Sequence, residues 1–81
     1  MEEKVAIIGL FVHDPEAAEK VNEILHRNAD MIIGRMGLPY RQCSMSIISV
    51  IVQASGDDIS ALSGNLGRIS GVTVKTMQTS V

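Results

Sequence analysis

The chain has 81 residues, 46% of them hydrophobic and 20% charged, so it is expected to fold as one small domain over residues 1–81. No apolar run reaches the roughly 18 residues of a membrane span, and the acidic start does not resemble a signal peptide. The single cysteine excludes an internal disulfide and suits a reducing cytoplasm. A net charge of −2 disfavours direct binding to nucleic acid.

The first two predicted elements are a strand and a helix. Residues 4–12 are apolar and rich in β-branched side chains, which is typical of a buried strand. Asp14 is a suitable N-cap and Pro15 suits the first helical position, so a helix is expected over residues 15–27. Apolar side chains recur at helical spacing on one face of this helix, and charged side chains occupy the other face.

Two strands are expected next, separated by a turn. The second strand should cover residues 30–36 and end before Gly37 and Pro39, because proline cannot join a central ladder. The third, over residues 45–54, is the strongest strand in the sequence, with a continuous run of apolar and β-branched side chains.

A second helix and a last strand complete the chain. The helix should begin after Ser55 or Asp57, either of which could cap it. Gly71 is expected at the C′ position, where a left-handed backbone ends a helix. Residues 72–77 alternate as a strand does, and residues 79–81 are expected to fray.

The order of elements is therefore β-α-β-β-α-β. Two βαβ units with right-handed crossovers, joined by a hairpin, form a four-stranded antiparallel sheet with both helices on one face. This α+β arrangement is the ferredoxin-like fold. Many unrelated functions use it, so the fold alone does not identify a role.

The face of the sheet away from the helices is predicted to be apolar too. The uniformly aliphatic half of each central strand is assigned to the helix side, which leaves Ile7, Phe11, Ile47 and Ile51 on the second face. Leaving these four side chains in water would forgo about 1.5–3 kcal/mol each. We therefore expect a homo-oligomer, a dimer or a dimer of dimers, with these residues in its interface. The alternative is that the C-terminal tail or the loop 37–44 covers this face.

Two stretches of sequence resemble a known family. Residues 57–75 read DDISALSGNLGRISGVTVK, and residues 35–41 have the spacing R-x-G-x-P-x-R. In these stretches the chain resembles the iron-only hydrogenase system regulators, small ACT-like proteins associated with such hydrogenases in anaerobes. The likeness covers nearly the whole chain, and residues 61–75 are its most specific part. It implies a fold similar to ACT domains and to the C-terminal domain of nickel-responsive repressors, which are oligomeric ligand-sensing modules.

Glycine placement differs from that of ACT domains. Those domains commonly have a glycine shortly after the first strand, where the backbone approaches an amino-acid ligand. This chain has Asp14, Pro15 and Glu16 there, and so bulky an acidic turn disfavours the usual amino-acid site. Gly64 and Gly67 lie inside the second predicted helix. Close packing on the sheet or on a neighbouring subunit is the favoured interpretation for them, ahead of approach by a ligand.

The candidate ligand site consists of polar side chains that cluster at the ends of the sheet: His13, Asp14, Arg35, Tyr40 and Arg41. The resemblance implies a site at such an end, and we expect the pocket to lie between subunits. Arg35 and Arg41 flank the hairpin and could bind an anion as a pair. Two arginines that keep a hairpin soluble are the simpler interpretation.

We expect no metal, no other cofactor and no catalytic centre. His13, His26 and Cys43 are the only soft metal-ligand candidates and show no H-x-H or C-x-x-C spacing. Chelation should therefore leave folding intact, although a metal site across a subunit interface is left open. No G-x-S-x-G, P-loop or G-x-G-x-x-G motif occurs, so an enzyme is not expected. Phe11 and Tyr40 are too few aromatic residues for the RNA-binding version of this fold.

These features predict a small cytoplasmic regulatory or sensing module that forms an oligomer and binds a small ligand or a protein partner. The resemblance adds an association with an iron-only hydrogenase system. Two alternatives are left open: a structural protein–protein interaction subunit without a ligand, and a regulator that acts with a separate DNA-binding partner. Neither a nucleic acid nor a membrane is expected as a direct partner.

Overall fold

The structure is a computed structural model that describes residues 3–81. Its elements follow the order β1 (Glu3–Val12), α1 (Pro15–Arg27), β2 (Ile32–Tyr40), β3 (Met45–Ser55), α2 (Gly56–Gly67) and β4 (Val72–Ser80). Short 3-10 turns, Ala29–Met31 and Arg41–Cys43, come before β2 and β3. No helix in residues 3–81 is long and apolar enough to cross a membrane.

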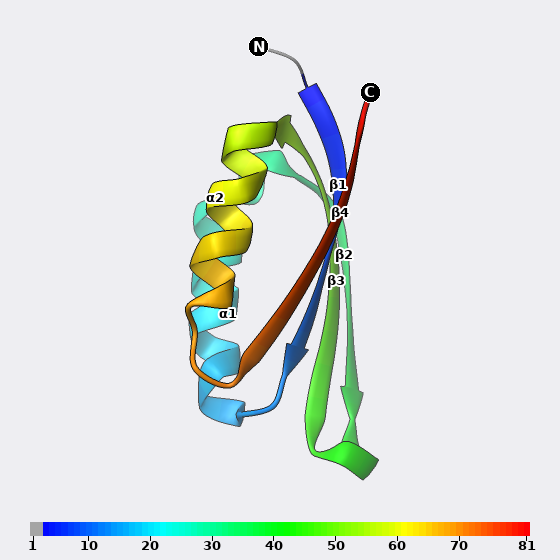
Figure 1. Cartoon of the computed structure of the whole chain (residues 1–81). Coiled ribbons are helices and arrows are strands. Elements are labelled where there is room, and N and C mark those ends of the chain that lie inside the picture. Colours follow the sequence, from blue (N-terminus) through cyan, green and yellow to red (C-terminus); the bar gives the residue numbers. More distant parts are fainter. Residues whose placement is uncertain (1–2) are drawn as a thin grey trace.

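The four strands form one antiparallel sheet in the order β2-β3-β1-β4. Both helices cover the same face of this sheet and leave the other face uncovered by any described helix (Figure 1). The predicted ferredoxin-like α+β fold is confirmed.

The hydrophobic core lies between the helices and the sheet. Even-numbered residues of the two central strands point into it, as the alternation of the sequence predicted. The buried side chains are Ala6, Ile8, Leu10 and Val12 of β1, Ile48, Val50, Val52 and Ala54 of β3, Ala17, Val21 and Leu25 of α1, and Ile59, Leu62 and Leu66 of α2.

Helix starts follow from their capping side chains. The Oδ1 of Asp14 accepts a hydrogen bond from the Glu16 N–H at 3.0 Å, and Pro15 is the first residue of α1. The hydroxyl of Ser55 accepts one from the Asp58 N–H at 3.2 Å, so Ser55 rather than Asp57 caps α2.

Two strands extend further than the sequence predicted. β2 continues through Gly37 and Pro39 to Tyr40, so the expected end at residue 36 is wrong. This strand is at the edge of the sheet, where proline is tolerated because one side of the strand needs no ladder bond. β4 also runs on to Ser80 and pairs with β1, so residues 79 and 80 are ordered rather than frayed.

Glycines in and after α2 correct one further expectation and part of a second, since packing of Gly64 and Gly67 on a neighbouring subunit stays a prediction. The helix ends at Gly67 with Arg68 as its C-cap, so Gly71 is not the C′ residue. Gly64 and Gly67 are exposed, and a Cβ added at either would meet nothing within 4 Å. They therefore make no close packing contact within this chain.

Gly71 nevertheless has the left-handed backbone, with φ +84°, in the turn that leads into β4. A Cβ there would lie 2.8 Å from the Cβ of Asp14. We expect Gly71→Ala to lower the melting temperature by at least about 4 °C, because left-handed backbone costs about 1–2 kcal/mol and each kcal/mol shifts a domain of this size by about 4–8 °C. Gly64→Ala, in open helix, should raise it slightly. Equal melting temperatures for Gly71→Ala and the wild type would contradict this prediction.

Candidate functional site

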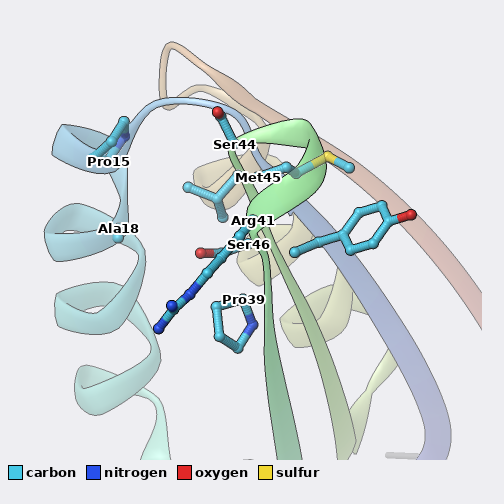
Figure 2. Close-up of a pocket in the computed structure, with 9 residues that line it drawn as sticks. Pro15, Ala18, Pro39, Arg41, Ser44, Met45 and Ser46 are labelled. Carbon is cyan, nitrogen blue, oxygen red and sulfur yellow. The ribbon is translucent and has the colours of Figure 1, made fainter.

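A pocket of about 320 Å³ lies between the start of α1 and the β2–β3 hairpin (Figure 2). Its α1 side is apolar, with Pro15 and Ala18, and its hairpin side mixes Pro39 with Arg41 and the hydroxyls of Ser44 and Ser46. The end of β1 contributes Val12. This volume is at the lower end of the range for small-molecule sites.

Local backbone structure positions the hairpin side of this pocket. Ser44 has φ 51° and ψ 45°, the left-handed region, which reverses the chain between the 3-10 turn and β3. Its N–H donates to the carbonyl of Arg41 at 3.2 Å. The side chain of Arg41 runs from the hairpin back toward α1 and passes beside Pro39 (Figure 2). The guanidinium group is therefore on the side of the hairpin that faces the pocket.

A second hollow of about 190 Å³ adjoins the first along α1 and shares Ala18, Pro39 and Ser46 with it. Arg35 lines this hollow and pairs with Val50 in the β2–β3 register, which places both on the helix side of the sheet. The Nη2 of Arg35 donates a hydrogen bond to the Oδ1 of Asn22 on α1 at 2.8 Å. We call the two hollows together the α1–hairpin groove.

The five residues predicted for the ligand site divide into two groups. Tyr40 and Arg41 line the first hollow and Arg35 lines the second. His13 and Asp14 line neither. The His13 Nε2 lies 3.3 Å from the Thr73 hydroxyl of β4, and Asp14 caps α1 and lies against Gly71 in the turn before β4. Placement of the pocket between subunits stays a prediction.

Sequence reasoning missed the groove residues on α1, in the hairpin turn and in β3, among them Pro15, Ala18, Asn22, Ser44 and Ser46. A signal for the β2 side was present in the R-x-G-x-P-x-R spacing. Alternate residues of a strand share one face, so reading residues 35–41 as extended backbone would have placed Arg35 and Pro39 together. The predicted turn at residue 37 concealed this.

The groove is electropositive. Neither hollow is lined by an aspartate or a glutamate. Within residues 3–81 the one ion pair joins Arg27 to Glu23 on α1, outside the groove. Arg35 is hydrogen bonded to a neutral amide, and Arg41 has no carboxylate partner in the described structure. Two guanidinium charges therefore face the groove in a chain whose net charge is −2.

The metal-ligand candidates lie apart. His13 precedes α1 and His26 is in its last turn, and Cys43 is exposed in the hairpin. Across residues 3–81, no three histidine, cysteine, aspartate or glutamate side chains come together. That folding needs no metal stays a prediction.

The uncovered face of the sheet carries the four residues predicted for an interface. The strand register pairs Phe11 with Ile47 and Ile7 with Ile51. Ile7 and Ile51 are 42% and 40% exposed, and the other two are half-buried. Their burial between subunits stays a prediction.

Side chains of the edge strands β2 and β4 extend this face, which carries two apolar rows. One row consists of Leu38, Ile47 and Phe11, and the other of Ile51, Ile7 and Met77. Between them runs a row of Met36, Ser49, Gly9 and Lys75. We call this surface the open face. Met36, Leu38 and Met77 were not predicted on this face, because β2 was expected to end at residue 36 and neither β2 nor β4 was assigned a face.

Solved structures show the same fold. The uncharacterized protein TM1266 from Thermotoga maritima is 41% identical, with a TM-score of 0.91 over 95% of this chain and 98% of that one. The C-terminal domain of MgtC from Mycobacterium tuberculosis is 11% identical, with a TM-score of 0.67 over 96% and 87%. A formyltetrahydrofolate deformylase from Pseudomonas putida KT2440 is 15% identical, with a TM-score of 0.68 over 90% of this chain and 28% of that one. The last two likenesses concern the fold alone.

No curated protein matches the chain. A family model does match, over residues 4–76, and its description is "TM1266-like: Iron-only hydrogenase system regulator, putative". This agrees with the family resemblance found in the sequence and with the similarity to TM1266 itself. The chain belongs to the TM1266-like family of iron-only hydrogenase system regulators.

Proposed function

We propose that this protein is a small cytoplasmic regulatory module of an iron-only hydrogenase system, and that it acts by binding rather than by catalysis. The observation that carries the proposal is the family match over residues 4–76. The electropositive α1–hairpin groove supports a binding role, because it offers a concave surface with hydrogen-bond donors to a small ligand.

We further propose that the module is a homo-oligomer in which a second copy of the chain covers the open face. The two segments that might have covered this face within one chain do not do so. The C-terminal residues extend β4, and residues 37–44 form the end of β2 and the hairpin. A second copy would bring the same apolar rows to the contact, as a two-fold symmetric interface requires.

The open face also supports the alternative of a structural interaction subunit that has no ligand, since protein partners bind to apolar patches of this kind. That alternative predicts no ligand in the α1–hairpin groove. Regulation through DNA would need a partner chain that carries the DNA-binding domain.

Deletion of the gene in the source organism tests the regulatory proposal. We expect hydrogenase activity per cell, or the level of hydrogenase transcripts, to change several-fold, and a plasmid copy of the wild-type gene to restore it. Complementation with Leu66→Asp, which puts an unpaired charge in the core of α2 and should prevent folding, should restore neither. Unchanged activity, transcripts and hydrogenase protein in the deletion strain would reject the proposal.

A further inference from the structure

The α1–hairpin groove has the composition of a site for an organic anion. Two guanidinium groups, those of Arg35 and Arg41, line its two hollows, and no acidic side chain lines either of them. A guanidinium group presents a planar fork of donors that matches a carboxylate or a phosphate. The charge of the groove therefore favours a ligand with an anionic head.

The other residues that line the groove indicate what the rest of that ligand should be like. Val12, Pro15, Ala18 and Pro39 give the larger hollow an apolar wall, and the hydroxyls of Ser44 and Ser46 lie on its hairpin side. A bare inorganic ion would leave this wall in contact with water. An apolar group attached to the anionic head would cover it, which is the usual pattern of a small-molecule site.

The two arginines differ in how firmly the structure holds them. Arg35 is fixed to α1 by its hydrogen bond to Asn22. Arg41 is exposed, and its side chain lies along the groove beside Pro39 (Figure 2). Both terminal amino groups of Arg41 are thus free to donate to a ligand, while Arg35 adds a positive charge at the far end.

We infer that the α1–hairpin groove binds a small organic anion, with a carboxylate or phosphate head held by Arg41 and a short apolar body against Pro15, Ala18 and Pro39. The inference rests on the proposed binding function and names the chemical class of its ligand. Arg35 strengthens the attraction of the groove for the head group. Ser44 and Ser46 supply further hydrogen-bond donors on the hairpin side.

Binding can be tested with simple probes on the purified wild-type chain by NMR titration. The probes are benzoate and phenyl phosphate as organic anions, benzamide as a neutral analogue of benzoate, and inorganic phosphate and sulfate as bare ions. We expect one or both organic anions to saturate with a dissociation constant of about 1 mM or below, with shifts at the amides of Ala18, Ser44 and Ser46. Benzamide should not saturate. Preference for one organic anion identifies the head group.

Matched variants locate the site. Arg41→Ala should weaken the organic anion by about tenfold or more, because a charge-assisted pair is lost, and Arg41→Lys should weaken it less. Arg68→Ala, which removes an exposed arginine beyond α2, should leave the affinity unchanged. Equal melting temperatures of the variants and the wild type will show that folding is intact.

Three results would overturn the inference. They are the absence of saturation by both organic anions, an affinity that Arg41→Ala leaves unchanged, and binding of the bare ions as tight as that of the organic anions. None of them affects the deletion experiment, which measures hydrogenase activity in cells. Anion binding in the groove with no hydrogenase phenotype would reject the regulatory proposal alone.

Discussion

Replacement of Ile51 by aspartate is expected to convert the proposed oligomer into a folded monomer. Ile51 lies on the central strand β3 in one apolar row of the open face and is 40% exposed in the single chain, so a carboxylate there can stay hydrated when the chain is alone. In the proposed interface the same carboxylate would be buried without a partner, at a cost of several kcal/mol. Association should therefore be lost while the fold is kept.

Sedimentation equilibrium at micromolar concentrations measures the mass, and circular dichroism monitors the fold. Asn65→Asp is the matched control, because it adds the same charge at an exposed position on α2 and should leave the mass unchanged. Ile47 is a less suitable target, since it is half-buried beside Leu38 and Phe11 and a charge there could unfold the chain. A monomeric wild type, or an Ile51→Asp variant with the wild-type mass, would show that no second copy occupies the open face.

Most of the fold could be predicted because it depends on local signals that agree with one another. The bounds of α1 follow from a capping aspartate, a proline at the first position and an apolar stripe on one face. The alternation in β1 and β3 assigned each residue to a face correctly, because both strands are central and the two helices cover one side of them.

The end of β2 could not be predicted, because proline is compatible with a strand only at the edge of a sheet and strand order is a property of the whole fold. Because the strand was expected to end at residue 36, before Gly37 and Pro39, the groove between β2 and α1 was not predicted. Arg35 and Pro39 face α1 only if residues 35–40 are extended. The contribution of Ala18 and Asn22 depends on how α1 packs across the sheet, which no local pattern in the sequence encodes.

His13 and Asp14 were grouped with the arginines because they are polar and lie at an end of the sheet. In the structure both residues make their contacts on the β4 side of β1, away from the β2–β3 hairpin. The backbone N–H of His13 donates to the carbonyl of Gly71 at 2.7 Å, and the side chain of Asp14 packs against the same glycine. These contacts connect the start of α1 to the turn before β4. Tyr40 and Arg41 are in the hairpin on the other side of α1, so they do not meet His13 and Asp14.

The core between helices and sheet is expected to be far more sensitive to substitution than the open face. Leu66 of α2 is fully buried, with 0% of its surface exposed. Leu66→Ala should lower the free energy of unfolding by about 2–5 kcal/mol, through lost burial and the cavity that remains. Since each kcal/mol shifts a domain of this size by about 4–8 °C, the melting temperature should fall by at least 8 °C.

Leu38→Ala is the matched control, because it makes the same change on the open face, where Leu38 is 57% exposed. In the isolated chain it should cost well under 1 kcal/mol, since most of the side chain is already in water. If a second copy covers the open face, the Leu38→Ala chain should be less stable than the wild type only at concentrations where the wild type associates, and equal to it on dilution. Thermal melts at several protein concentrations measure both effects. Similar losses for the two variants at every concentration would mean that Leu38 is packed within its own chain, and that the two faces of the sheet were wrongly distinguished.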